Sequence, residues 1–273
     1  MLKTRVLTAI PIALLALALI FLAPPWLFRL AMALLWLVGC REFSRLCGLG
    51  PVSSWILVLL QSVILGLMYR YWGAISQHAL AFLVAGVLAW CVMFLRLVNF
   101  RPGQTAGLNY RLISFFCALS GVSFAWYSLS WLRGQPSGEY LILILLFIIW
   151  ASDIGAYFTG KQFGRHKLAP NISPGKTREG LLGGLAAAVL VALALSQLTG
   201  TPASGPLALA VVTLVTALAS AAGDLFISLH KRTLGLKDSG RLFPGHGGVL
   251  DRFDSLLAGS PFFALGVLFL GWP

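Results

Sequence analysis

The amino-acid sequence predicts an all-α, polytopic integral membrane helical bundle with about nine transmembrane helices. Hydrophobic residues make up 59% of the 273 residues and charged residues only 10%, whereas soluble globular chains carry roughly 45–50% and about 25%. So few charges cannot cover a water-soluble surface of this size. The apolar segments are continuous and rich in Leu and Ala, which excludes the short alternating segments of a transmembrane β-barrel.

Nine apolar stretches define the expected helices, at about 5–22, 26–40, 52–70, 78–98, 111–132, 139–160, 180–199, 205–226 and 253–272. Lys3 and Arg5 precede the first stretch, as in a signal peptide. Pro24-Pro25 stands where the small residues of a cleavage site belong, so a retained helix is favoured. No long polar linker divides the chain, and we expect one integral membrane domain over 1–273 with its motif-bearing catalytic half at about 150–273.

Basic residues predict the orientation in the membrane. With the N-terminus inside, 17 of the 20 Lys and Arg fall on the inner side, which leaves Arg29, Arg70 and Arg133 outside. The two longest polar segments, at about 161–179 and 227–252, are then both cytoplasmic. We therefore expect a multi-pass protein whose active site faces the cytoplasm, in the inner or cell membrane if the source is bacterial.

The net charge of +12 would suggest nucleic acid as a partner in a soluble protein. Basic loops beside a membrane explain the excess without nucleic acid. Attraction to anionic lipid or to a phosphorylated substrate is the more specific alternative. The four cysteines form no CxxC pair and are interpreted as reduced packing residues: Cys40, Cys47, Cys91 and Cys117.

Only eight carboxylates are present, and six of them lie beyond residue 150. Asp153 and Asp224 fall within apolar stretches, where an ionisable group costs about 2.5–3.5 kcal/mol on insertion scales and needs a partner or a metal. For Asp153, a structural ion pair or helix–helix hydrogen bond is an equal alternative. Asp224 is expected to be functional because of the polar segment that follows it.

That segment, 228–254, is basic, then rich in Gly and Pro, then acidic. Lys231, Arg232 and Lys237 supply positive charge for phosphate oxygens. Gly247-Gly248 allows backbone N–H groups to approach an anion, and the following helix N-terminus adds a favourable dipole. The alternative, a solvated basic loop before a capped helix, does not explain so many acids in a chain so poor in charge.

Asp251 and Asp254 are three residues apart and share a helix face. Their hard oxygens suit Mg²⁺, which takes one or two carboxylates plus substrate phosphates. Asp224 ends one apolar stretch and Asp251 precedes the last, so both are expected at the cytoplasmic mouth as primary metal ligands.

A second polar segment contains Gly175-Lys176-Thr177. It lacks the first glycine of a P-loop and no strand is expected before it, so a Walker A site is excluded. Ser173, Lys176 and Thr177 at a helix start remain candidate phosphate contacts.

These segments resemble the signature of the phosphatidate cytidylyltransferase (CDP-diacylglycerol synthase) family. The agreement includes Ser228, Lys231-Arg232, Lys237-Asp238, Pro244, His246-Gly247-Gly248, Asp251-Arg252 and Asp254. The segments 153–160 and 173–180 resemble the family pattern too, so the motifs cover about 150–255. Arg178 departs from it, since many members carry an aromatic residue there.

The resemblance implies transfer of the cytidylyl group from CTP to phosphatidic acid, giving CDP-diacylglycerol and pyrophosphate for phospholipid biosynthesis. It implies Mg²⁺, with room for a monovalent cation such as K⁺, and a homodimer among membrane lipids, with no nucleic acid. Catalytic roles go to Asp224, Asp251, Lys237, Asp238 and Asp254, with Asp224 and Asp251 as the metal ligands. Substrate contacts go to Ser173, Lys176, Thr177, Ser228, Lys231, Arg232, His246, Gly247, Gly248 and Arg252.

Two other functions stay open. One is another CTP-dependent membrane lipid enzyme, such as a polyprenol kinase or a cytidylyltransferase for a different lipid phosphate. The other is a transporter, which is less favoured because the polar segments lie only in the second half of the chain. His246 has two equal interpretations, a pyrophosphate contact or a support for the Gly-Gly turn.

Overall fold

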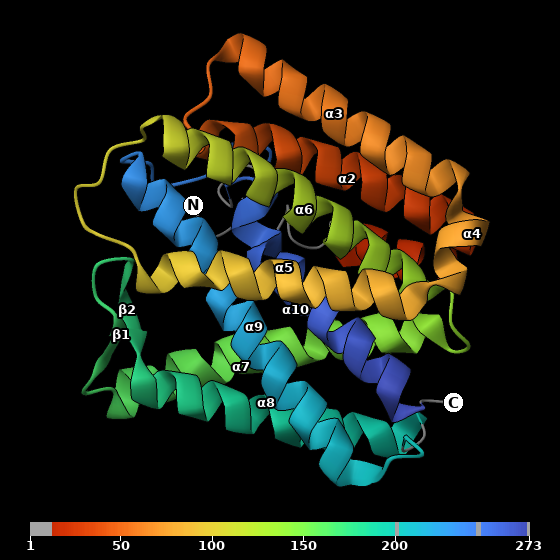
Figure 1. Cartoon of the computed structure of the whole chain (residues 1–273). Helices are drawn as coiled ribbons and strands as arrows, with labels where there is room; N and C mark the ends of the chain where they lie inside the picture. The colour runs from red at the N-terminus through yellow and green to blue at the C-terminus, as the bar shows by residue number, and fades with distance from the viewer. Residues whose placement is uncertain (1–12, 200–201, 244–246, 272–273) are drawn as a thin grey trace.

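Long α-helices run through the computed structural model, which describes residues 13–199, 202–243 and 247–271 (Figure 1). The first described residues, 13–21, are helical. They are followed by α2 (Pro25–Leu46), α3 (Pro51–Arg70), α4 (Trp72–Gln77), α5 (Ala79–Val98), α6 (Leu108–Arg133), α7 (Gly138–Phe163), α8 (Arg178–Thr199), α9 (Gly205–Thr233) and α10 (Leu250–Leu270). Between α7 and α8, β1 (Lys167–Ala169) and β2 (Ser173–Thr177) form an antiparallel hairpin in which Lys167 pairs with Thr177.

The prediction of an all-α polytopic membrane bundle is confirmed, but the count of about nine transmembrane helices is not matched. Among the described residues, seven helices are long and apolar enough to cross a membrane, namely α3 and α5 to α10. The stretch at 26–40 is part of α2, which carries Arg29, Arg41, Glu42 and Arg45 and is therefore too polar to qualify. The stretch at 5–22 lies partly outside the described residues.

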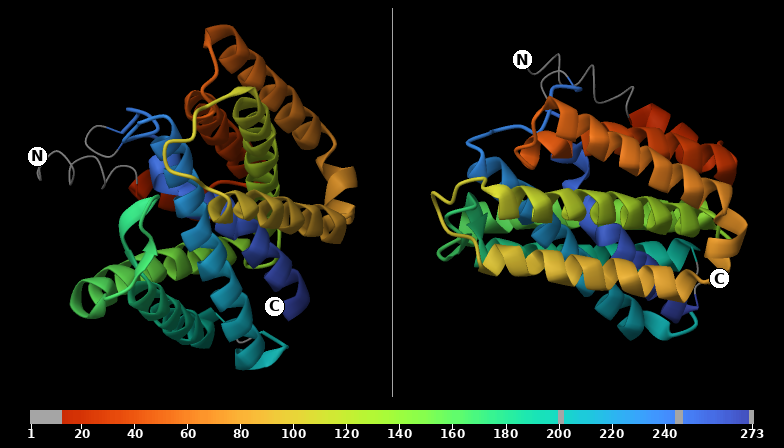
Figure 2. Two further views of the ribbon diagram at one scale, coloured as in Figure 1. Left: turned by 60° about the vertical axis from the view of Figure 1, so that its left-hand side comes forward. Right: turned by 45° about the horizontal axis from the view of Figure 1, so that its top comes forward.

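The helices alternate in direction, so their connections gather at two ends of the bundle (Figures 1 and 2). One end, called the polar end here, holds the loops after α2 and α5, the β1–β2 hairpin and the described parts of the α9–α10 loop. Arg70 and Arg133 end α3 and α6 at the opposite end. The two polar segments singled out in the sequence therefore lie at the same end of the bundle.

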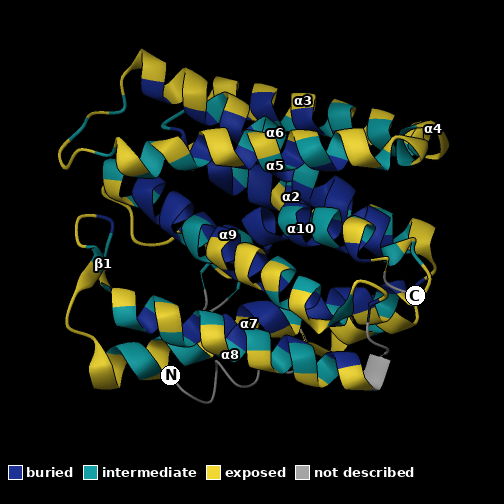
Figure 3. Cartoon of the chain, turned by 60° about the horizontal axis from the view of Figure 1, so that its bottom comes forward, coloured by how far each residue is buried: buried dark blue, intermediate teal, exposed yellow. Residues whose placement is uncertain are grey.

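The interior of the bundle is aromatic and aliphatic. Trp36, Trp90 and Trp126 are fully buried, and the Trp126 indole donates its proton to the Arg29 carbonyl oxygen at 2.8 Å. The outer surface is apolar as well: large hydrophobic side chains are exposed along α3, α5 and α7, and exposed residues follow the outer helix faces in Figure 3. An apolar exterior of this kind is suited to contact with lipid.

Small residues bring α7 and α8 close together. A Cβ atom placed on Gly155 would lie 2.6 Å from the Cβ of Ala187, and one on Gly184 would lie 2.5 Å from the Ser152 carbonyl oxygen. Close helix packing through glycine and alanine is a common solution in membranes, where dispersion contacts replace the hydrophobic effect. This packing supports the base of the β1–β2 hairpin, because the hairpin joins the same two helices.

We predict that Gly155→Val destabilises the bundle, because the larger side chain must push α7 and α8 apart; overpacking of this kind typically costs about 1–3 kcal/mol. Thermal unfolding in detergent measures the effect. Gly66→Val is the matched control, since nothing lies within 4 Å of a Cβ at Gly66. Equal stability of the two variants would contradict the packing described here.

Candidate active site

The hairpin and α8 are joined by a capped helix start. Thr177 ends β2, and its Oγ1 accepts the N–H of Gly180 at 3.0 Å in the first turn of α8. In the same turn, the Glu179 carboxylate lies 2.6 Å from His166 Nδ1 and accepts the backbone N–H of Arg165 at 3.1 Å. These bonds hold both ends of the hairpin against α8 and so fix the direction of the intervening strand residue, Lys176.

Lys176 forms the first ion pair of the site. Its Nζ lies 2.6 Å from Asp224 Oδ2 on α9, and the hydroxyl of Ser228, one helical turn further on, donates to Asp224 Oδ1 at 3.2 Å. Asp153 on α7 interacts electrostatically with both Lys176 and Asp224. A lysine of the hairpin is therefore placed between aspartates of two membrane helices.

The second ion pair is formed by Lys231. This residue lies near the end of α9, one helical turn after Ile227. Its Nζ lies 2.8 Å from Asp251 Oδ1, and only 8% of the Asp251 side chain is exposed. Asp251 Oδ2 accepts the N–H of Ser239 at 2.8 Å, the hydroxyl of Ser239 at 3.0 Å and the N–H of Gly248 at 3.0 Å. Every oxygen of this carboxylate thus has a donor.

Asp254 links the two pairs. Its Oδ1 accepts the N–H of Ser255 at 2.8 Å, and its carboxylate interacts electrostatically with Asp224, Lys231 and Lys176. The Asp–Lys cluster, as we call it from here, consists of Asp153, Lys176, Asp224, Lys231, Asp251 and Asp254. Four carboxylates against two ammonium groups leave a formal excess of two negative charges.

This excess and the oxygen donors fit a divalent cation. Among the described residues, no three His, Cys, Asp or Glu side chains converge into a metal-binding group. The protein can therefore offer one or two carboxylates, which is the mode in which Mg²⁺ binds when substrate phosphates complete its coordination. Asp224 is the more accessible of the two predicted ligands, with 31% of its side chain exposed. To bind a metal ion, Asp251 would first have to lose one of the hydrogen bonds that it accepts.

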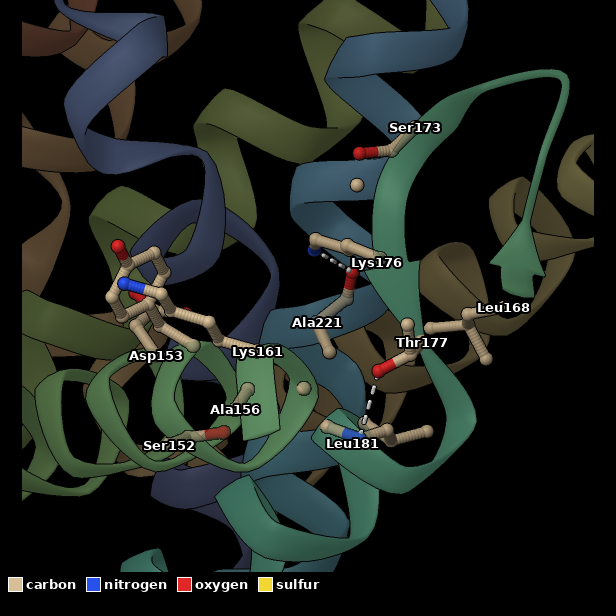
Figure 4. Close-up of a pocket in the computed structure, with 14 residues that line it drawn as sticks. Ser152, Asp153, Ala156, Lys161, Leu168, Ser173, Lys176, Thr177, Leu181 and Ala221 are labelled. Atoms are coloured by element: carbon tan, nitrogen blue, oxygen red, sulfur yellow. Dashed lines mark hydrogen bonds between the residues drawn. The ribbon is translucent and has the colours of Figure 1, made fainter. Parts of the chain in front are cut away.

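A cavity of about 400 Å³ lies beside the cluster, between α7, the hairpin, α8 and α9. Asp153 and Lys161 of α7 line one side of it and Lys176 of β2 the other (Figure 4). Tyr157 and Leu181 add apolar surface to the lining. The cavity therefore combines ammonium groups with apolar walls, as binding of an amphiphilic anion requires.

The structure brings together many of the residues predicted from the sequence. Asp224, Asp251, Asp254, Lys176 and Lys231 belong to the Asp–Lys cluster. Ser228 bonds to Asp224, Gly248 to Asp251, and Ser173 lines the cavity. Gly247 takes a positive φ of 84° in the turn before α10. Glycine adopts this conformation more readily than residues that carry a Cβ atom.

Other predicted residues lie apart from the cluster. Lys237 and Asp238 are exposed and bond to none of the described residues, and Arg252 is exposed at the start of α10. Arg232 donates from Nε to the Ile172 carbonyl oxygen at 3.2 Å, between β1 and β2. Thr177 is not one of these, because it caps α8 and also lines the cavity beside Lys176. His246 lies outside the described residues.

Sequence reasoning gave no role to Glu42, which bonds to the backbone of Val249 and Leu250 at the start of α10. A signal was available, since Glu42 is the only acid before Glu139 and closely follows the apolar stretch at 26–40. Sequence reasoning also missed the buried contact of Arg96 Nη1 with His230 Nε2 at 3.2 Å, next to Lys231.

The fold and the cluster together define a membrane-embedded enzyme equipped for anionic substrates. The chain matches the Cytidylyltransferase family over residues 3–270 and belongs to that family, so it is a nucleotidyltransferase and the resemblance stated above is confirmed.

Relatives in three bacteria are named phosphatidate cytidylyltransferase. The chain is 32% identical to the protein of Haemophilus influenzae, over 99% of this chain and 100% of the relative. It is 36% identical to that of Pseudomonas aeruginosa, over 100% and 99%, and 38% identical to that of Brucella suis, over 94% and 90%. The similarity therefore extends well beyond the motif-bearing half.

We predict that Lys231→Ala lowers kcat/KM by about 10- to 100-fold, because losing a hydrogen bond to a charged group costs about 1.5–3 kcal/mol. Steady-state kinetics on purified enzyme measures the loss. Arg101→Ala, an exposed basic residue at the same end, is the control and keeps wild-type kinetics. A Lys231→Ala enzyme that matches this control would contradict the importance of the second ion pair.

Proposed function

We propose that the protein is a phosphatidate cytidylyltransferase, which converts CTP and phosphatidate to CDP-diacylglycerol and pyrophosphate. The observation that carries the proposal is the Asp–Lys cluster beside an amphiphilic cavity, in a chain similar to enzymes of that name over nearly its full length. The catalytic half of the chain corresponds to residues of about 150–273, where all six cluster residues lie.

In the proposed reaction a phosphate oxygen of phosphatidate attacks the α-phosphorus of CTP. The new P–O bond forms as the bond between the α-phosphorus and the bridging oxygen breaks, and pyrophosphate leaves. Because the attacking phosphate is already anionic near neutral pH, no strong general base is needed. Catalysis then rests on positioning and on neutralising negative charge.

Lys176 and Lys231 pair with Asp224 and Asp251 in the structure. In the proposed function, substrate phosphates compete with these aspartates for the two ammonium groups. The further proposed substrate contacts are Ser173, Thr177, Ser228, Arg232, the Gly247-Gly248 turn, His246 and Arg252. Lys237 and Asp238 keep the catalytic roles that the family signature implies. Mg²⁺ held by Asp224 and Asp251 would neutralise the charge of the triphosphate and of the leaving pyrophosphate. The like charges of Asp254 and Asp224 repel each other, and a bound cation would relieve that repulsion. A monovalent cation such as K⁺ is a further component of the proposal.

The polar end of the bundle faces the cytoplasm in this proposal, in the inner membrane of a bacterium. CTP then reaches the cluster from water and phosphatidate reaches it from the lipid leaflet. The protein acts as a homodimer among membrane lipids.

Product analysis tests the function. Purified protein in lipid micelles with Mg²⁺ and CTP should form CDP-diacylglycerol and pyrophosphate with phosphatidate as acceptor, measured by mass spectrometry. Phosphorylated polyprenol with release of CDP would support a polyprenol kinase instead. Turnover of neither acceptor, together with solute uptake in proteoliposomes, would support a transporter.

We predict that Asp224→Asn and Asp251→Asn each abolish most turnover. Asparagine keeps the shape and polarity of the side chain but removes the negative charge that a lysine or metal ion requires. The assay is CDP-diacylglycerol formation per folded enzyme across a Mg²⁺ titration. Asp153→Asn has a milder effect if Asp153 is a structural partner of Lys176. Full activity of both main variants would contradict the proposed ligand pair.

The proposed orientation predicts that the C-terminus lies outside. A reporter enzyme fused after Pro273 should be active only on the outer side of the membrane, because 17 of the 20 basic residues belong to the opposite side. A fusion after Arg101, in the loop between α5 and α6, is the matched control and should report the cytoplasm. A C-terminal reporter that is active only in the cytoplasm would overturn the orientation.

A further inference from the structure

Glu42 reaches from α2 to the start of α10. Only 6% of the residue is exposed. Its Oε1 accepts the N–H of Val249 at 2.9 Å and its Oε2 accepts the N–H of Leu250 at 2.9 Å. A carboxylate at this position satisfies N–H groups that have no partner within their own helix and complements the positive end of the helix dipole.

The same carboxylate is connected to Asp251 through Ser239. The Ser239 hydroxyl lies 2.9 Å from Glu42 Oε2 and 3.0 Å from Asp251 Oδ2. A hydroxyl has one proton, so it donates to only one of the two carboxylates at a time. The Ser239 N–H donates to Asp251 at 2.8 Å. A displacement of Glu42 would therefore move Ser239, which donates hydrogen bonds to Asp251.

Two glycines enclose the Glu42 carboxylate. A Cβ atom on Gly240 or on Gly248 would overlap Glu42 Oε1 or Oε2, respectively. Neither glycine has a positive φ, so the reason for glycine here is close approach to Glu42. The loop before α10 is thus fitted around a side chain that lies some 200 residues earlier in the sequence.

We propose that Glu42 is a positioning residue for cytidylyl transfer. It holds Ser239 and the first turn of α10 in the arrangement that directs Asp251 toward Lys231. This inference rests on the proposed function, since it makes the geometry of Asp251 matter for turnover. A residue of the N-terminal half thereby belongs to the catalytic machinery of the C-terminal half.

The first test is Glu42→Gln. A glutamine offers one acceptor and one N–H₂ donor, so one N–H of α10 loses its acceptor and meets a donor. We expect faster amide hydrogen exchange over 239–251 and a kcat about 10- to 100-fold lower, as is typical of misplaced catalytic groups. Glu139→Gln is the control, because Glu139 pairs with Arg133 at 3.5 Å at the opposite end of the bundle. It should leave both quantities unchanged.

The second test approaches the same contact from the loop. Gly240→Ala adds one methyl group against the Glu42 carboxylate and should reproduce the faster exchange and the lower kcat. Gly50→Ala is the matched control, since nothing lies within 4 Å of a Cβ there. This variant keeps Glu42 itself, so it provides the test if Glu42→Gln does not fold.

Three results bear on the proposal. Faster exchange over 239–251 together with a lower kcat supports it. Unchanged exchange overturns it, and so does faster exchange with an unchanged kcat, which would leave Glu42 a structural role only. A wild-type enzyme that is inactive with CTP and phosphatidate contradicts the proposed function instead, while the exchange data still decide whether Glu42 holds Asp251.

Discussion

Carboxylates packed among apolar helices need a positive partner or several hydrogen-bond donors, and this requirement shapes the arrangement of the polar end. Asp224 is paired by Lys176 from the hairpin and Asp251 by Lys231 from the preceding helix. A buried carboxylate with neither kind of partner is strongly disfavoured, and Glu42 takes the second solution by accepting the N–H groups of Val249 and Leu250. A divalent cation would offset the formal excess of negative charge that remains, so in the proposed function the constraint that shapes the fold also prepares the site for a metal ion.

The sequence predicts features that depend on neighbouring residues better than features that depend on contacts between distant parts of the chain. The long apolar stretches predict the helices because membrane insertion is decided locally, by length and hydropathy. The sequence also predicts that Asp224 and Asp251 lie toward the same end of the bundle, although α9 continues past Asp224 to Thr233. It does not predict the pairing of Lys176 with Asp224, because that pairing depends on how a hairpin folds back over α9.

Glu42 and Thr177 are two further residues whose partners cannot be predicted from the surrounding sequence. The partners of Glu42 are backbone N–H groups of a distant helix, and no residue pattern around Glu42 encodes them. Thr177 is predicted to contact phosphate; the structure adds that its hydroxyl caps α8 and that the residue lines the cavity. A hydroxyl at a helix start serves either purpose with the same local sequence, so only the position of the helix distinguishes a cap from a ligand contact.

The N-terminal helices are more than a membrane anchor for the motif-bearing half. Glu42 of α2 bonds to the start of α10, and Arg96 of α5 lies against the buried His230 beside Lys231. Both residues of the second ion pair thus adjoin groups held from the first half of the chain. This dependence agrees with similarity to relatives that extends over the full length rather than over the motifs alone.

We propose that metal and nucleotide meet at the Asp–Lys cluster. Electron paramagnetic resonance of Mn²⁺, added in place of Mg²⁺ to purified protein with CTP, measures this most directly. The account predicts a protein-bound Mn²⁺ signal for the wild type and for Glu139→Gln, and its loss in Asp224→Asn and Asp251→Asn. A bound signal that persists unchanged in both aspartate variants would contradict the account.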